Sequence, residues 1–400
     1  MLNVTRLLCG SPSPGDGLRY GEPPPKGPGA FSSQQKVHHR PVVVWNVTRQ
    51  CNLRCEHCYV AATEHRSPKE LTRKEALEVV RDLAQFEVPA ILFSGGEPLM
   101  RTDLFELMQT AHDLGAVPVL STNGTLLTDE IVSLLCRSGV KRVGISLDGL
   151  EGTNDHFRGV TGAFRRALDG IRSCREAGIR VSLRFTLTQH NAQDLEGIFE
   201  LVEREEIPRL CIYHLAYAGR GRRLLPQDLT NQECREILVR IFQSTIGLHR
   251  QGADVEVLTV ANHADGPYLL LWAQEHTPER VPEINRLLTA NGGNSSGLGI
   301  GCIDERGVVH PDQFWRTSKL GNVRVRSFSK IWQDKRDPLL QQLRNRKRLL
   351  TERCRNCRFL PLCNGNLRER AEAATGDIWG MDPACYLSEE EIGAVSGLSD

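Results

Sequence analysis

The chain lacks both a long apolar run and a strong bias of charge. Its 400 residues carry a formal net charge of +1 and are 40% hydrophobic. Nowhere do about 18 apolar residues follow one another, so no membrane span is expected, and the balanced charge argues against a nucleic-acid partner. The first apolar patch is shorter than the roughly 7–15-residue core of a secretion signal. We therefore expect a cytoplasmic protein.

Aromatic residues are also scarce, at 6%, whereas cysteines are numerous, at 13. Disulfides do not persist in a reducing compartment, where clustered cysteines more often bind metal. Six cysteines are scattered and are best interpreted as small buried apolar side chains. The others form two tight groups, one of Cys51, Cys55 and Cys58 and one of Cys354, Cys357, Cys363 and Cys385.

The chain divides into four segments. Residues 1–40 are rich in Gly, Pro and Ser without a helical or strand period, which predicts an N-terminal arm. From residue 41 to about 215, short apolar runs alternate with amphipathic stretches, in about six βα repeats. The predicted strands cover residues 41–47, 90–94, 117–121, 142–147, 180–187 and 210–215.

Strands separated by helices pair in parallel, with the helices outside. Six units are too few for a closed eight-stranded barrel of roughly 250 residues, so the pattern predicts an α/β fold with an open, partial barrel over residues 41–240. The active site is expected at the carboxyl ends of the strands, and the first cysteine group directly follows the first strand. Residues 241–295 are predicted to form a helical bridge to a smaller C-terminal metal-binding domain, residues 296–400.

The first cysteine group, CNLRCEHCY, has the spacing C-x3-C-x2-C. A zinc site would be four-coordinate and is often built from paired C-x2-C units, of which only one occurs here. An iron–sulfur cube usually takes four thiolates. Three cysteines therefore predict a cube with one iron open to another ligand.

Four motifs carry a resemblance to a known family. CNLRCEHCY, FSGGEPL, STNGTLL and GISLDG resemble, in order and spacing, the motifs of radical S-adenosylmethionine (SAM) enzymes. The resemblance covers about residues 41–215 and implies a partial (β/α)6 radical SAM barrel, in which SAM occupies the open iron of a [4Fe-4S] cluster. It also implies an external one-electron reductant, such as flavodoxin or ferredoxin, and cleavage of SAM to a radical that abstracts hydrogen.

The same resemblance implies the SAM contacts. Gly95 and Gly96 have no side chains, which lets the backbone approach the methionine amine. Asn123 and Ser146 are expected to face the adenosine or its ribose. Two arginines are candidates for the SAM carboxylate, with a solvated or salt-bridged role as an equal alternative. The complete expected set is Tyr59, Gly95, Gly96, Glu97, Pro98, Asn123, Ser146, Arg158 and Arg184.

The second cysteine group resembles the SPASM or twitch extensions of radical SAM enzymes, which hold auxiliary clusters. Its C-x2-C-x5-C run is completed by Cys385. The chain departs from the full SPASM pattern, because Asp312 and Leu367 stand at two further cysteine positions. One auxiliary [4Fe-4S] cluster is therefore expected, giving two clusters in all. Its four thiolates favour electron transfer, and a zinc site on the same ligands is the alternative.

From about residue 38 onward the chain resembles the tetrapyrrole-modifying branch of this family. The stretch NGGNSSGLGIGCIDERGVVHPDQFW carries much of the likeness. The branch implies a didecarboxysiroheme substrate, whose two acetates are removed to give Fe-coproporphyrin III in a siroheme-based haem pathway. Removal of propionates, as in dioxo-haem (heme d1) biosynthesis, is one alternative, and a SPASM peptide maturase is another.

Such a substrate is a flat macrocycle with carboxylates at its edge and iron at its centre. Arginines bind carboxylates bidentately, which makes Arg220 and Arg222 in GRGRR candidates. A histidine ligand to the iron is sought in His214, His310 or the pair at residues 38 and 39. Each of these residues has an ordinary alternative, as a solvated arginine or a hydrogen-bonded histidine.

Overall fold

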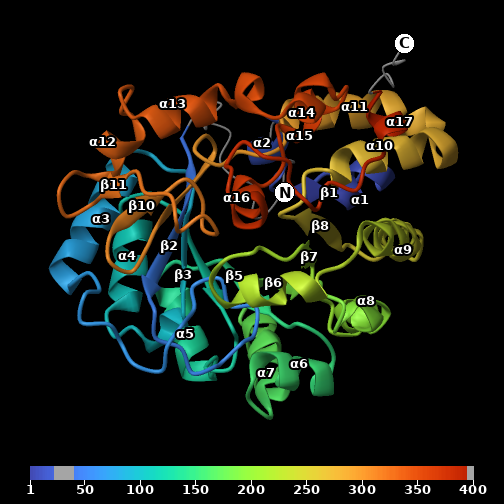
Figure 1. The fold of residues 1–400 in the computed structure, drawn as a ribbon. Coiled ribbons are helices and arrows are strands. Elements are labelled where there is room, and N and C mark those ends of the chain that lie inside the picture. The colour runs from blue at the N-terminus through green and yellow to red at the C-terminus, as the bar shows by residue number, and fades with distance from the viewer. Residues whose placement is uncertain (22–39, 394–400) are drawn as a thin grey trace.

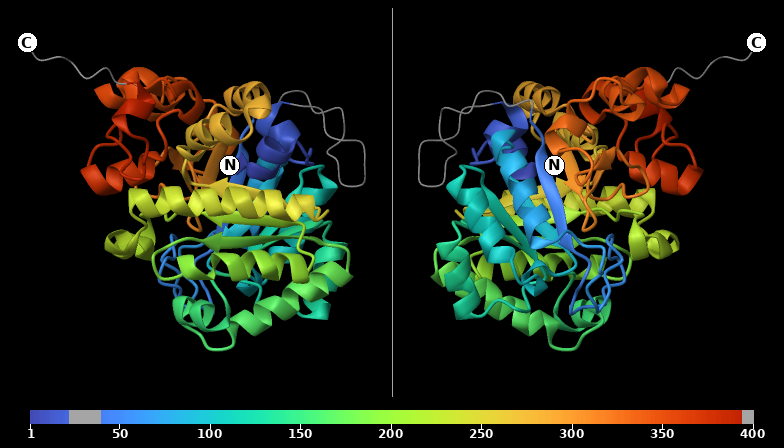
Figure 2. Two further views of the ribbon diagram at one scale, coloured as in Figure 1. Left: turned by 90° about the vertical axis from the view of Figure 1, so that its right-hand side faces the viewer. Right: turned by 90° about the vertical axis from the view of Figure 1, so that its left-hand side faces the viewer.

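The computed structural model describes residues 1–21 and 40–393, and its central feature is one sheet of 11 strands. The strand order is β1-β8-β7-β6-β5-β4-β3-β2-β9-β10-β11. The eight strands from β9 to β8 pair in parallel, and antiparallel strands flank them. Helices lie outside the curved sheet (Figure 1), and Figure 2 shows the C-terminal segment above its open end. The predicted α/β partial barrel with a C-terminal domain is confirmed.

All six predicted strands are present, with each boundary within two residues of its predicted position. They pair in sequence order because a helical segment lies between each strand and the next. Their carboxyl ends therefore share one edge of the sheet. The strands are β2 Val42–Thr48, β3 Ile91–Gly95, β4 Pro118–Thr122, β5 Arg142–Ser146, β6 Arg180–Thr186 and β7 Arg209–Tyr213.

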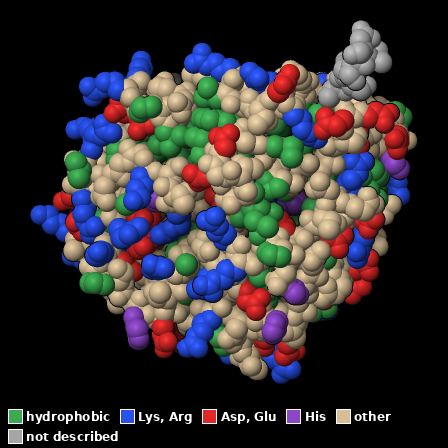
Figure 3. Space-filling model, viewed as in Figure 1, with side chains coloured by type: hydrophobic (Ala, Val, Ile, Leu, Met, Phe, Trp, Pro, Cys, Tyr) green, Lys and Arg blue, Asp and Glu red, His purple; other side chains and the backbone are tan. Residues whose placement is uncertain are grey.

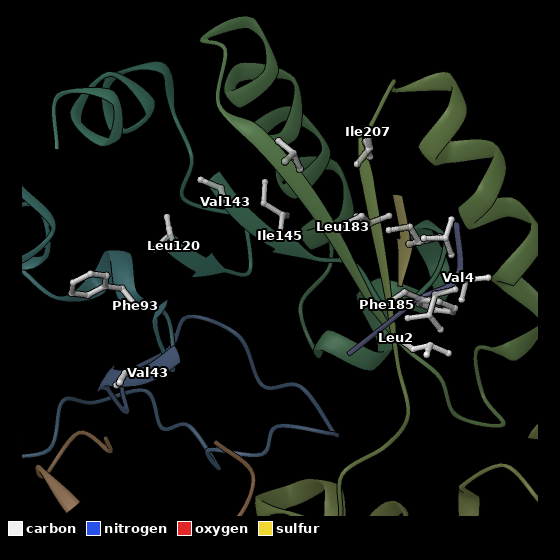
Figure 4. Close-up of a cluster of buried hydrophobic side chains, with 14 of the residues drawn as sticks. Leu2, Val4, Val43, Phe93, Leu120, Val143, Ile145, Leu183, Phe185 and Ile207 are labelled. Atoms are coloured by element: carbon white, nitrogen blue, oxygen red, sulfur yellow. The ribbon is translucent and has the colours of Figure 1, made fainter. Parts of the chain in front are cut away.

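Alternating side chains of these strands pack against the outer helices. Phe93, Val143 and Leu183 are fully buried or nearly so and belong to the main hydrophobic cluster (Figure 4). Residues between them face the inside of the barrel, as the period of two requires. The helices are α3 Arg73–Gln85, α4 Leu104–Asp113, α5 Asp129–Arg137, α6 Glu151–Arg158, α7 Ala163–Glu176, α8 Leu195–Arg204 and α9 Asn231–Arg250, with short turns η1 Pro98–Met100, η2 Ala192–Asp194 and η3 Gly219–Gln227.

Two further parallel strands extend the barrel. β8, Glu256–Val260, pairs with β7 inside the segment that was predicted to be a helical bridge, so that prediction was incomplete. All five β8 residues are buried, and a short buried run cannot be told from a helix by its period. The rest of the bridge is helical, as α10 Asp265–His276, η4 Pro278–Arg280 and α11 Val281–Asn291.

The C-terminal domain is joined to the barrel through the sheet itself. β9, Ile300–Ile303, pairs with β2, and β10, Val308–His310, and β11, Gly321–Asn322, continue from it. Within the described residues no helix is long and apolar enough to cross a membrane; cytoplasmic localisation stays a prediction. The remaining helices are α12 Phe328–Trp332, α13 Pro338–Arg344, η5 Arg346–Leu349, α14 Glu352–Asn356, α15 Leu360–Cys363, α16 Arg368–Thr375 and α17 Glu389–Ile392.

The N-terminus is ordered against the barrel, so the prediction of an arm without regular structure was wrong for its first half. β1, Leu2–Asn3, pairs antiparallel with β8, and α1, Val4–Cys9, and α2, Asp16–Tyr20, follow. Such short helices depend on packing rather than on propensity, and the fully buried Val4 and Leu7 supply it. The rest of the predicted arm, residues 22–39, lies outside the described residues.

A buried carboxylate anchors this N-terminal segment. Glu256 at the start of β8 accepts hydrogen bonds from Asn3, Ser13 and Arg19 and forms an ion pair with Arg209. Burial favours the neutral acid, but the two arginines lower the pKa of Glu256 to about 2. The network ties residues 1–21 to the amino ends of β7 and β8.

Replacing Glu256 with Gln should lower the free energy of unfolding by about 3–5 kcal/mol, because buried arginines lose their partner. The folded pKa, about 2, lies below the ordinary 4.5. The carboxylate's contribution is therefore complete above pH 4.5 and is lost as the pH falls toward 2. Urea unfolding at pH 7 and at pH 4 measures both effects.

The matched control is Glu106→Gln, which breaks an exposed pair with Arg73 and should change stability little. Equal losses in the two variants would show that the Glu256 network does not hold the N-terminal segment.

Candidate active site

The first cysteine group lies in an irregular loop after β2, at the carboxyl edge of the sheet. Backbone donors point at two of its sulfurs. Leu53 N–H donates to Cys51 Sγ over 3.4 Å, and Ala62 N–H donates to Cys58 Sγ over 3.3 Å. Cys55, which lies between these two cysteines in the sequence, is buried. Hydrogen bonds of this kind stabilise thiolates and tune metal clusters.

The three cysteines lie close together, in one small cluster with Leu53 and Ala163. Burial raises the pKa of Cys51 to about 12, and it also raises the pKa of Cys55. Such thiols stay protonated near neutral pH until a metal displaces the proton. Three grouped thiols, with N–H donors pointing at the sulfurs, fit a cluster with three protein ligands.

Gly95, the last residue of β3, and Gly96 after it pack against the start of the cysteine loop. Gly96 N–H donates to Thr48 O over 2.8 Å, and Glu97 N–H donates to Gln50 O over 2.7 Å. A Cβ on Gly96 would lie 2.1 Å from Gln50 O, and one on Gly95 would lie 2.3 Å from Thr48 O. Gly95 also has a φ of +137°. Glycine is required here for the approach of backbone to backbone.

Glu97 joins two strand ends beneath this contact. Its carboxylate accepts hydrogen bonds from Leu99 N–H at 3.1 Å, Thr122 Oγ1 at 2.8 Å and Asn123 N–H at 2.9 Å. Burial raises its pKa to about 7 in spite of these donors. Glu97 therefore caps the short helix η1, whose first residue is Pro98, and also holds the end of β4.

Asn123 faces the cysteine loop from the end of β4. Its Nδ2 donates to Asn52 Oδ1 at 2.8 Å, and its Oδ1 accepts from Thr125 N–H at 2.9 Å and from the Thr125 hydroxyl at 2.7 Å. Asn52 also donates to Thr125 Oγ1. Asn123 thus lies beside the first cysteine, where the sequence placed a SAM contact.

Tyr59 points into the barrel. Its hydroxyl donates to Asn46 Oδ1 at 3.0 Å and shares a hydrogen bond with Ser94 Oγ at 3.1 Å. Its ring meets Phe314 of the C-terminal domain edge to face, 5.3 Å between centroids. The residue therefore links the cysteine loop to the domain that covers the barrel.

Arg184 lies across the inner face of the sheet. Its guanidinium donates to Ser121 Oγ, and it passes so close to Gly144 that a Cβ there would lie 2.4 Å away. Ser146 is its register partner on β5. Both residues are partly exposed, unlike the core residues on the other face. Arg184 and Ser146 thus share the inner surface expected to receive SAM.

Arg158 has a different set of partners. It donates to Cys55 Sγ at 3.7 Å and forms a buried ion pair with Asp148, which raises its pKa above the ordinary range although burial opposes this. His57 approaches the same carboxylate at 3.2 Å, and Thr186 N–H donates to its other oxygen. Asp148 is a site residue that the sequence analysis missed, although GISLDG contains it.

The two arginines of GRGRR do not converge on one site. Arg220 donates from Nε to Cys55 O at 2.8 Å and from Nη1 to Ala62 O at 2.7 Å, so it braces the cysteine loop. Its Nη2 is buried without a partner within the described residues. Arg222 is exposed and donates a long hydrogen bond, 3.5 Å, to Ala373 O.

The candidate histidines are engaged by protein groups. His214 follows β7 and lies 3.0 Å from Asp265, whose other oxygen accepts from the Tyr386 hydroxyl. Burial lowers the pKa of His214, but Asp265 outweighs it and raises the value to about 10. His310 lies between Ser318 O at 2.7 Å and an aspartate at 3.4 Å. Residues 38 and 39 lie outside the described residues.

The second cysteine group surrounds α14 and α15. Phe359 N–H donates to Cys357 Sγ at 3.4 Å, and Arg353 donates to Cys385 Sγ at 3.6 Å. Burial raises the pKa of Cys363 to about 12. Cys354 lies on α14 and Cys363 on α15, two helices that contact each other, and Arg353 of α14 reaches Cys385. The assignment of all four cysteines as ligands stays a prediction.

Asp312 and Leu367, which stand at two cysteine positions of the full SPASM pattern, have structural roles. Asp312 accepts from Ser296 Oγ, Phe314 N–H and Trp315 N–H. Leu367 packs in an apolar cluster on the inner side of β7 and β8. Among the described residues, no three His, Cys, Asp or Glu side chains have the geometry of a single-ion site.

Sequence comparisons agree with both domains. The profile of the Radical SAM superfamily matches residues 45–202, and that of the SPASM iron–sulfur cluster-binding domain matches residues 297–358. The chain is 50% identical to Fe-coproporphyrin III synthase of Methanosarcina barkeri, over 98% of this chain and 99% of that protein. It is 42% identical to pre-heme d1 synthase of Dinoroseobacter shibae, over 90% and 89%. The expected cofactors, SAM and [4Fe-4S] clusters, follow from the two domains.

Solved structures support the fold. Native anSMEcpe with bound AdoMet has a TM-score of 0.68 at 18% identity, over 88% of this chain and 96% of that one. Streptococcus suis SuiB bound to S-adenosylmethionine has a TM-score of 0.67 at 18% identity, over 87% and 78%.

Replacing Cys51, Cys55 and Cys58 together with Ala should remove about half of the iron and all SAM cleavage, because one of two four-iron clusters loses its ligands. Iron analysis and chromatography of the cleavage products measure this. Cys136→Ala, on an outer helix, is the control and should keep both. Full iron content in the triple variant would contradict the ligand assignment.

Replacing Gly96 with Ala should displace the cysteine loop, because the new methyl group meets Gln50 O. We expect loss of the first cluster, seen as reduced iron content and visible absorption, with the second cluster kept. Gly247→Ala on α9 is the control, since a Cβ there has open space. Intact clusters in Gly96→Ala would show that this contact does not position the loop.

Proposed function

Because the chain belongs to the radical SAM superfamily, in the branch that carries a SPASM domain, we propose that it is an Fe-coproporphyrin III synthase. It would convert 12,18-didecarboxysiroheme to Fe-coproporphyrin III by radical removal of two acetate side chains. The observation that carries this proposal is the 50% identity to a curated enzyme of that name over 98% of the chain.

The inner face of the barrel suits an amphipathic macrocycle. Cys211 and Leu258 of β7 and β8 form an apolar cluster there, which Phe314 and Leu367 of the C-terminal domain cover. Arg184 of β6 lies on the same inner side, and three strands separate β6 from β2. Apolar walls with a few fixed polar groups are typical of cofactor-sized ligand sites, and arginine is suited to the carboxylates at the macrocycle edge.

Some of the site residues would hold the cofactors, and others hold the cysteine loop in place. Bound together, the [4Fe-4S] cluster and SAM supply the radical chemistry that attacks an unactivated carbon. We assign the cluster to Cys51, Cys55 and Cys58. Asn123 and Arg184, with Ser146, line the adjacent SAM site.

Around them, protein contacts fix the loop. Gly95 and Gly96 seat its start on β3, and Arg220 braces its end through two carbonyls. Arg158 lies beside the proposed cluster, because it forms an ion pair with Asp148 and donates a hydrogen bond to the sulfur of Cys55. A bridge of this kind orients the ligand rather than the substrate.

The proposal also includes a source of electrons and a second candidate reaction. An external one-electron reductant, such as flavodoxin or ferredoxin, would supply the electron for SAM cleavage. Removal of propionates is the second candidate reaction, supported by the 42% identity to pre-heme d1 synthase. Acetate removal is favoured because the identity is higher and covers more of the chain.

Anaerobic incubation of the reduced enzyme with SAM and didecarboxysiroheme, followed by mass spectrometry, tests the reaction. We expect loss of two acetates and formation of 5′-deoxyadenosine. Loss of propionates would establish the second candidate instead. Deoxyadenosine with unchanged tetrapyrrole would exclude both, and so would the absence of a Soret shift when the protein is titrated with the substrate.

A further inference from the structure

A strongly basic stretch runs up to the second cysteine group. Residues 344–358 contain seven Lys or Arg against one acidic residue, Glu352, in a chain whose net charge is only +1. Figure 3 shows Lys and Arg side chains along the upper edge of the molecule, over α13 and the turn that follows it. Lys347 and Arg348 are exposed, and no carboxylate within the described residues forms an ion pair with either. The surface formed by Arg344, Lys347 and Arg348 is called the basic surface below.

The basic surface borders a hollow. Residues Arg344 to Arg348, together with Asn364, line a pocket of about 510 Å³. Asn364 directly follows the ligand Cys363, so one wall of the pocket belongs to the cysteine group itself. The pocket is open to solvent on the side of the charged residues, since Lys347 and Arg348 are exposed. An acidic segment of a partner would find complementary charge here.

The floor of the hollow is fixed to the cysteine group. Arg346 is buried, and its guanidinium donates to Asn294 Oδ1 and to a neighbouring backbone carbonyl. Asn294 N–H in turn donates to Cys363 O at 3.1 Å, and Asn364 Nδ2 donates to Asn294 O at 2.7 Å. Hydrogen bonds therefore connect Arg346, which directly precedes the exposed Lys347 and Arg348, to the predicted ligand Cys363 through Asn294.

The four cysteines are not deeply enclosed. Cys354, Cys357, Cys363 and Cys385 are each intermediate in exposure, whereas Cys302 in the sheet is fully buried. Transfer of an electron between proteins needs the two redox groups close together, so an accessible cluster beside a docking surface is favourable. Positive charge around the cluster also stabilises its reduced form, which carries one more negative charge.

We propose that the basic surface is the docking site for a small acidic one-electron carrier protein, which reduces the cluster held by Cys354, Cys357, Cys363 and Cys385. This inference rests on the proposed function, which requires an external reductant. One electron leaves the reduced carrier and enters the oxidised cluster, and no bond or proton is transferred. Charge complementarity selects an acidic protein, and the neighbouring cysteine group selects a redox protein among acidic proteins.

The test is the rate at which a reduced acidic ferredoxin bleaches the oxidised enzyme, followed by stopped-flow absorbance. Lys347→Glu combined with Arg348→Glu should lower the second-order rate constant about tenfold at low salt and reduce its salt dependence. Arg137→Glu combined with Lys141→Glu makes the same change of charge at exposed positions on α5 and before β5. This control should stay within about twofold of the parent protein.

Reduction by dithionite separates docking from folding and from the proposed function. A small reductant needs no docking surface, so dithionite-driven SAM cleavage should be the same in all three proteins. If the enzyme fails to convert didecarboxysiroheme but the ferredoxin effect persists, the proposed function is wrong and the docking site stands. Equal ferredoxin rates in the two charge-reversed variants would overturn the docking proposal.

A second variant tests the point of entry. Cys354→Ala combined with Cys357→Ala removes ligands of the C-terminal cluster and keeps the first cysteine group. The ferredoxin rate should then fall at least as far as in the charge-reversed variant, while dithionite still reduces the remaining cluster. Unchanged reduction by ferredoxin would show that electrons enter elsewhere.

Discussion

The contact between the backbone of Gly96 and the carbonyl of Gln50 is the constraint on which the site depends. The cysteine loop has no helix or strand of its own, so its shape must come from neighbours. Gly95 and Gly96, at the end of β3, contact its beginning, and Arg158 and Arg220 hold its middle and end. Glu97 fixes the strand ends beneath the loop. A cluster with only three protein ligands needs such support, because the open iron must face a defined direction.

The barrel strands could be predicted because each is a short apolar run between amphipathic helices, and that pattern repeats. The strands and helices outside the six repeats could not be predicted in this way. EVLTV in β8 is buried on both faces and has no period to separate it from a helix, and β9 is only four residues long. The N-terminal helices are stabilised by a network on Glu256, a residue more than 230 positions away from either of them. Such partners are visible only once the chain is folded.

The same distinction applies within the site. The cysteines and the GGEP glycines were predictable because spacing and lack of side chains are properties of the sequence itself. The partners of Arg158, Arg220 and His214 were not, since each is chosen by contacts between distant segments. His214 was one candidate for an iron ligand, and in the structure it lies 3.0 Å from Asp265, at the start of α10, which outweighs burial and raises the pKa of His214. Asp148 was overlooked because its importance depends on three groups that meet at its carboxylate only in the folded chain, namely Arg158, His57 and the N–H of Thr186.

The pairing of β2 with β9 has a consequence for biosynthesis. Val42 is translated 258 residues before its partner Ile300, so one edge of β2 has no strand beside it until the ribosome has made most of the chain. Unpaired edges of apolar strands are prone to associate with other chains. Completion of the barrel thus waits for the C-terminal domain, and the nascent polypeptide carries an open edge for most of its synthesis.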